Sequence, residues 1–266
     1  MLFHRFVLVL LCLCQLGISQ ATIDETKVWN DFLAWLKTQP AVAAEAMVPE
    51  YKPYLIKSGL SEGQANRYVS ILQRLVKEKR LEVIASDFDR IYVTDASWFK
   101  KTPNAFLTRV VSDLKPGRAV DVSMGQGRNS LFLAEKGWDV TGFDVATEGL
   151  RIARERADKS GLKITTVRAT HQDFDCGRDR WDLVVMTYSQ APTNRPEFIQ
   201  RIYDGLKPGG LVLVEDSEGS HPRTTTDNFL LKWFGDFRIL RYETANTGCE
   251  WGNPESPVYR LFAQKP

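Results

Sequence analysis

The sequence predicts an α/β fold: a mostly parallel, seven-stranded sheet that ends in an antiparallel strand pair and is preceded by a helical extension. Two features of the 266-residue chain support this prediction. From residue 118 onward, short runs rich in β-branched residues alternate with helical patterns, which is typical of parallel strands covered on both faces. Before residue 100, apolar residues recur at helical spacing instead.

Residues 22–80 are predicted to be helical. The first helix shows an i, i+3, i+4, i+7 spacing, carried by Trp29, Phe32, Leu33 and Leu36, and its pattern ends before Pro40. Ser61 is placed to cap a longer helix that has one apolar stripe. We interpret this stripe as packing surface, with a lid or a dimer face as the alternative. The helical extension is assigned to residues 22–100.

Residues 101–266 are assigned to the α/β domain. A helix predicted over 103–114 ends at Pro116-Gly117. Then follow strand 118–122, helix 128–136, strand 139–143, helix 147–159, strands 163–168 and 181–187, helix 196–206 and strand 211–215. Two last strands, near 237–243 and 257–264, are joined by a polar loop without a helical pattern, so we expect them to be antiparallel.

Residues 1–21 are predicted to be an export signal. His4 and Arg5 form a short charged start, an apolar stretch follows, and Ser19-Gln20-Ala21 is a small-x-small cleavage site. The apolar stretch is shorter than the roughly 20 residues that span a bilayer, so no stable membrane insertion is expected. We expect a periplasmic or secreted mature protein. An uncleaved membrane anchor and a cytoplasmic protein with a misassigned start codon are the alternatives.

The charge and cysteine content argue against several classes of partner. The formal net charge is +2 and no basic stripe is present, so no nucleic-acid partner is expected. No His, Cys or carboxylate cluster has the spacing of metal ligands, so no metal is expected. Cys176 and Cys249, the cysteines beyond the signal, can pair or remain free thiols. The sequence carries no indication of oligomeric state.

A glycine-rich turn follows the first predicted strand. In "VDVSMGQGRNS", Asp121 is followed by Ser123, Gly125 and Gly127 at alternate positions, and a helix opens directly afterwards. Glycine lets the backbone approach a ligand closely, and the helix N-terminus presents free N–H groups to it. Asp144 ends the second strand, where a carboxylate can accept both hydroxyls of a ribose. The pattern predicts a nucleoside-containing ligand; a turn without any ligand is the alternative.

These residues resemble a known family. "VDVSMGQGRNSLFLAEKGWDVTGFDVA" is similar to the opening of class I S-adenosylmethionine (SAM)-dependent methyltransferases of the type 11, tellurite-resistance-like, small-molecule kind. The family pattern is D-x-G-x-G-x-G with an acid closing the second strand, and here Ser123 replaces the first glycine. "HQDFD", "WDLVVMTYS" and "LKPGGLVLVED" resemble later motifs in the family's order. The resemblance covers roughly residues 103–266 and implies a Rossmann-like fold.

The resemblance also implies the cofactor, the activity and the site. The cofactor would be SAM, and the activity methyl transfer to a small-molecule acceptor. The implied cofactor-binding residues are Asp121, Ser123, Gly125, Gly127, Asp144, Val145, Asp173, Phe174 and Thr187. Asp173 would accept a hydrogen bond from the adenine amino group. Tyr188, after the fourth strand, is the candidate catalytic residue that positions the acceptor or the sulfonium; packing under the next helix is the alternative.

Other interpretations stay open. An NAD-type oxidoreductase shares the glycine turn and Asp144, although Asp121 and "LKPGG" disfavour it. A non-catalytic SAM-binding module gains weight from export, because SAM is made in the cytoplasm. We interpret His171 and His221 as solvated loop residues; for His221, the rim of the acceptor pocket is the alternative. Cys249 and Trp251 are candidates for the mouth of the pocket, with a surface loop as the alternative.

Overall fold

The structure is a computed structural model that describes residues 23–94, 100–217, 228–246, 248–251 and 253–266. The predicted export signal and His221 lie outside these residues. The elements, in chain order, are α1 (Glu25–Leu36), α2 (Ala44–Lys57), α3 (Glu62–Glu78), α4 (Arg80–Val93), α5 (Ala105–Val111), β1 (Arg118–Val122), α6 (Arg128–Glu135), β2 (Asp139–Asp144), α7 (Thr147–Lys159), β3 (Thr165–Arg168), β4 (Trp181–Thr187), α8 (Pro196–Gly205), β5 (Leu206–Ser217), α9 (Phe229–Trp233), β6 (Arg238–Ala245) and β7 (Val258–Gln264).

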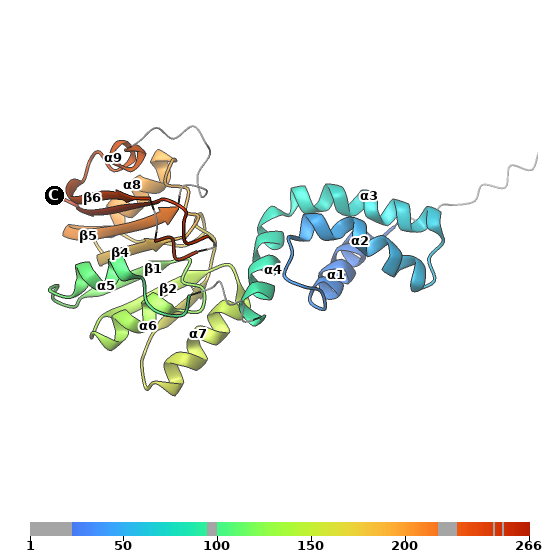
Figure 1. Ribbon diagram of the computed structural model, residues 1–266, viewed down its shortest axis with the longest axis horizontal. Coiled ribbons are helices and arrows are strands. Elements are labelled where there is room, and N and C mark those ends of the chain that lie inside the picture. The colour runs from blue at the N-terminus through green and yellow to red at the C-terminus, as the bar shows by residue number, and fades with distance from the viewer. Residues whose placement is uncertain (1–22, 95–99, 218–227, 247, 252) are drawn as a thin grey trace, which may run out of the picture.

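Helices α1–α4 form a lobe that lies beside the sheet (Figure 1). The Asp24 side chain caps α1, and Ser61 and Gln64 form a reciprocal capping box at the start of α3, as the sequence predicted for Ser61. The apolar faces of these helices share one buried cluster, whose largest members are Trp29, Phe32 and Tyr51. The lobe therefore has a hydrophobic core of its own.

Helix α4 lies beyond residue 80, where the predicted helical stretch ended, but within the predicted helical extension of residues 22–100. It continues to Val93 and packs against α7 of the α/β domain. Its Val83 belongs to the core of the helical lobe, whereas Tyr92 reaches the glycine turn. The helix thus connects the two parts of the molecule.

The sheet has the strand order β3-β2-β1-β4-β5-β7-β6. Strands β1 to β5 are parallel, and β7 runs antiparallel to both β5 and β6. This confirms the predicted fold class, including the antiparallel pair at the end. The sequence did not indicate α9, and β5 begins earlier than predicted, at Leu206.

Alternation along the strands gives the sheet two buried faces. Val120 and Val184 point into a core formed with α8 and α9, while Ala119 and Leu183 face α5 and α6. Because β1, β2 and β4 are parallel neighbours, their carboxyl ends meet at one edge of the sheet. In open α/β sheets, ligands bind at this edge.

Candidate functional site

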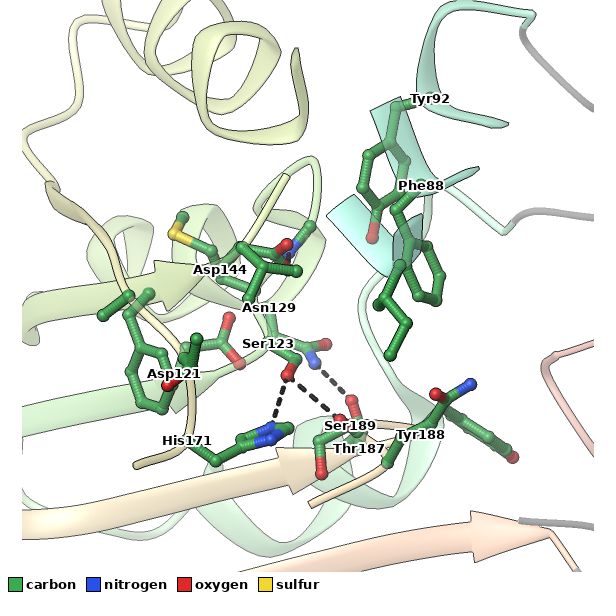
Figure 2. A pocket seen from close by; sticks show the side chains of 18 of the residues that line it. Phe88, Tyr92, Asp121, Ser123, Asn129, Asp144, His171, Thr187, Tyr188 and Ser189 are labelled. Atoms are coloured by element: carbon green, nitrogen blue, oxygen red, sulfur yellow. Dashed lines mark hydrogen bonds between the residues drawn. The ribbon is translucent and has the colours of Figure 1, made fainter. Parts of the chain in front are cut away.

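A cavity of about 150 Å³ lies at the carboxyl ends of β1, β2 and β4 (Figure 2). Its floor comes from the glycine turn and from the ends of these strands. The loop after β3 and helix α4 form opposite sides. Seven of the residues predicted from the sequence line it: Asp121, Ser123, Gly125, Asp144, Val145, Thr187 and Tyr188.

The glycine turn has left-handed backbone conformations at alternate residues. The φ angles are 56° at Ser123, 52° at Gly125 and 75° at Gly127. This explains why glycine suits the first position of the family motif, since a side chain there is strained. Gly127 does not line the cavity: a Cβ there would lie 3.0 Å from the Cβ of Ala153, so this glycine permits close packing on α7.

Asp144 ends β2 with its carboxylate turned back over the turn. Its Oδ2 accepts a hydrogen bond from the Gly125 N–H at 2.9 Å, and its Oδ1 accepts one from the Ala146 N–H at 2.8 Å. The side chain is buried, and desolvation raises the pKa of this carboxyl. Each oxygen retains a lone pair, so the group still fits the hydroxyls of a ribose.

Asp121 is a second buried carboxylate of the cavity. It is 2% exposed, and its Oδ2 accepts a hydrogen bond from the Ser130 hydroxyl at 2.6 Å. Burial is the main cause that raises its pKa to about 6. A positively charged ligand in the cavity would meet two buried carboxylates.

His171 belongs to the site, so its interpretation as a solvated loop residue is wrong. Its Nε2 lies 3.0 Å from the Ser123 Oγ, which in turn donates to the Ser189 carbonyl at 3.0 Å (Figure 2). Burial lowers the pKa of His171. The imidazole is therefore neutral at pH 7 and can accept a proton. These contacts also explain how serine is accommodated where the family motif has glycine.

Tyr188 lines the cavity, but its hydroxyl is engaged elsewhere. The hydroxyl donates to Glu215 Oε1 at 2.8 Å and accepts from the Glu250 N–H at 2.9 Å. Glu215 is fully buried and forms an ion pair with Arg260. This arrangement fixes the loop after β4, where Tyr188 has a left-handed φ of 51°. The catalytic role of Tyr188 stays a prediction.

The segment after β3 contributes other residues than those predicted. Asp173 is exposed and accepts a hydrogen bond from Thr170 Oγ1 at 2.7 Å, and Phe174 stacks on Phe143 at a centroid distance of 4.2 Å. Neither lines the cavity, whereas Ala169, Thr170 and His171 do. The cofactor contacts of Asp173 and Phe174 stay predictions; Asp173 lines a neighbouring hollow together with Val145 and Thr170. The loop turns earlier than the motif indicated, so that Thr170 is the residue facing the cavity.

Several lining residues were missed by the sequence analysis. Phe88 and Tyr92 come from α4, and Asn129 from the first turn of α6, where its amide donates to Thr187 Oγ1 at 2.8 Å. An apolar stripe was readable in α4, because Leu81, Ile84, Phe88 and Tyr92 recur every three or four residues. Of the two residues that the sequence analysis named for the mouth of the pocket, Trp251 lines the cavity and Cys249 does not.

Three further features concern candidate metal sites, the cysteines and membrane-spanning helices within the described residues. In these ranges no three His, Cys, Asp or Glu side chains gather as metal ligands. Cys176 and Cys249 are both buried free thiols. Among the helices that the structure describes, none is both long enough and apolar enough to cross a membrane.

Comparison with known proteins shows what this chain is similar to. Residues 119–210 match the model of a methyltransferase domain. The chain is 26% identical over 186 residues to the probable SAM-dependent methyltransferase TehB of Haemophilus influenzae, a match that covers 61% of this chain and 63% of that protein. It is 32% identical over 97 residues to the ubiquinone biosynthesis O-methyltransferase of Cereibacter sphaeroides, covering 36% of this chain and 39% of that one.

The fold is also found among solved structures. The crystal structure of TehB from Haemophilus influenzae matches with a TM-score of 0.50 at 22% identity, covering 61% of this chain and 62% of that one. The match with TehB thus leaves part of each protein uncovered. Residues 119–210, which match the methyltransferase-domain model, contain the glycine turn and Asp144.

Proposed function

We propose that the chain carries a class I SAM-dependent methyltransferase domain and that it transfers a methyl group from SAM to a small-molecule acceptor. The observation that carries the proposal is the buried carboxylate of Asp144, which faces the cavity beside the backbone of Gly125. Asp121 supports it, because a second buried carboxylate favours a cationic ligand in the same cavity.

The residues divide the work as follows. SAM, when bound, supplies a methyl group that its positively charged sulfur has already activated. Asp144 would hold the ribose hydroxyls, and the glycine turn leaves room for close approach to the backbone. The cavity walls around Asp121, Asn129 and Thr187 would exclude water and hold the acceptor atom close to the methyl group. Placing these two reacting atoms correctly is the main source of acceleration for a direct displacement. Where an acceptor must lose a proton, the neutral His171 would be the candidate base, through the ring nitrogen that does not contact Ser123.

We predict that Asp144→Ala weakens SAM binding by ten-fold to several hundred-fold. Each hydrogen bond to a charged acceptor contributes about 1.5–3 kcal/mol, so the predicted range corresponds to the net loss of one such bond, or of two at the lower end of that scale. Asp144→Asn should do less harm because it keeps one acceptor oxygen. The measurement is titration calorimetry with SAM, S-adenosylhomocysteine and NAD on each variant.

Asp139→Ala is the matched control, because Asp139 begins the same strand and is exposed. It should bind SAM as the wild type does. Tight binding of NAD without binding of SAM would make the protein an oxidoreductase, and binding of neither would leave an inert module. If Asp144→Ala binds SAM with the affinity of the wild type, the ribose does not lie at Asp144.

We also propose that the mature protein is exported. The charged start, the short apolar stretch and Ser19-Gln20-Ala21 support this proposal. Mass spectrometry of the native protein should find a chain that begins near residue 22. A soluble cytoplasmic chain with Met1 intact would contradict it.

A further inference from the structure

Helix α4 lies against the cavity, and its Tyr92 side chain fills the space beside the glycine turn (Figure 2). A Cβ built on Gly125 would lie 2.6 Å from the Tyr92 hydroxyl oxygen. A Cβ built on Gly149, in the first turn of α7, would lie 2.8 Å from Cε2 of the same ring. Tyr92 is 6% exposed. Gly125 of the site and Gly149 of α7 thus leave the space that the Tyr92 ring occupies.

Further contacts hold α4 in this position. Asp89 Oδ1 accepts a hydrogen bond from the Glu148 N–H at 2.7 Å and so caps the first turn of α7. The Gln126 side-chain amide, within the glycine turn, donates to the Tyr92 carbonyl at 2.9 Å. The ring of Phe88 contacts those of Tyr92 and Trp251 at centroid distances of 5.8 and 6.0 Å.

The cavity that remains beside the Tyr92 ring is smaller than the pockets that usually take ligands of drug size. The cavity measures about 150 Å³. Pockets for ligands of drug size begin at roughly 300 Å³. A ligand held by Asp144 and by the backbone of Gly125 must therefore use space that the Tyr92 ring takes in this arrangement.

We propose that α4 competes with the cofactor for the cleft: with Tyr92 seated against Gly125 and Gly149 the cleft is closed, and SAM binds when α4 moves away. This inference rests on the proposed function, because SAM is the ligand for which α4 would compete. The apparent dissociation constant then equals the intrinsic constant divided by the fraction of molecules in which the cleft is open. A substitution that destabilises the closed position of α4 should therefore lower the apparent dissociation constant for SAM.

Two substitutions test the inference. Tyr92→Ala removes the ring from the cleft. Asp89→Ala removes the tie to α7 and does not alter the lining of the cavity. We expect each to tighten the binding of S-adenosylhomocysteine by about ten-fold, through faster association. Tyr54→Ala, at an exposed tyrosine of α2, is the matched control and should leave the affinity unchanged.

The outcomes separate this inference from the proposed function. If Tyr92→Ala weakens binding, Tyr92 is a wall of the cofactor site and the inference is wrong. If wild type and both variants bind alike, competition by α4 is wrong while the proposed function stands. If none binds SAM or S-adenosylhomocysteine, the proposed function fails and takes the inference with it. Asp89→Ala keeps the test decisive should Tyr92→Ala not fold.

Hydrogen exchange of the wild-type protein gives an independent measurement. Saturating S-adenosylhomocysteine should speed the exchange of backbone amides in α4 while slowing it in the glycine turn, because one leaves the cleft as the other is covered. Slower exchange in both segments would show that α4 stays seated over the bound ligand and would overturn the inference.

Discussion

Burial sets the protonation of Asp121, and this has a measurable effect on stability. The pKa of its carboxyl is raised from 3.8 to about 6, chiefly by desolvation. Between these values the folded protein keeps a proton that the unfolded chain releases, so stability falls as the pH rises. The loss reaches about 3 kcal/mol above pH 6, from about 1.4 kcal/mol for each pKa unit. Asp121→Asn should remove this pH-dependent loss of stability, because an amide does not titrate.

Urea unfolding of wild type and Asp121→Asn between pH 4 and pH 8 measures the effect. The difference in unfolding free energy should change up to about pH 6 and then level off. Asp139→Asn, on an exposed residue, should follow the wild-type curve. If the unfolding free energies of wild type and Asp121→Asn differ by the same amount at every pH, the raised pKa assigned to Asp121 is wrong.

The strands show why so much of the α/β domain could be predicted from the sequence. Strands buried on both faces need apolar runs, and the turns between them need glycine or proline, so β1, β4 and α7 have the predicted bounds. The order of the glycine turn and Asp144 identifies the floor of the site for the same reason. Local pattern and local structure agree in these segments.

The positions of helix α4 and of the loop after β3 could not be predicted, because they depend on contacts between segments that are far apart in the sequence. The apolar stripe of α4 indicates a helix, but only packing shows that it lies on α7 and brings Tyr92 to Gly125. Likewise, "HQDFD" contains two acids and one histidine, and the path of the loop decides that His171 turns inward and Asp173 outward. The sequence thus predicts the floor of the cavity better than its sides.

At the scale of the molecule, the helical lobe and the α/β domain have separate hydrophobic cores. The cluster built around Trp29 and Phe32 shares no residue with the clusters on the two faces of the sheet. Helix α4 belongs to both parts, through Val83 on one side and Tyr92 on the other. The helical lobe holds α4, the helix that closes the cleft. Destabilising the lobe should therefore open the cleft more often, while the sheet stays folded.

Trp29→Ala tests this separation. Trp29 is 2% exposed, and its indole N–H donates to Glu82 Oε2 at 2.7 Å. Truncating a buried tryptophan costs about 3–5 kcal/mol. We expect hydrogen exchange to accelerate in α1–α3 and to remain slow in β1, β4 and β5. Trp181→Ala, at a tryptophan that is 1% exposed in the sheet core, should give the reverse pattern. Equal acceleration of both parts by either variant would show that the two cores unfold as one unit, and α4 would then be a fixed part of the fold.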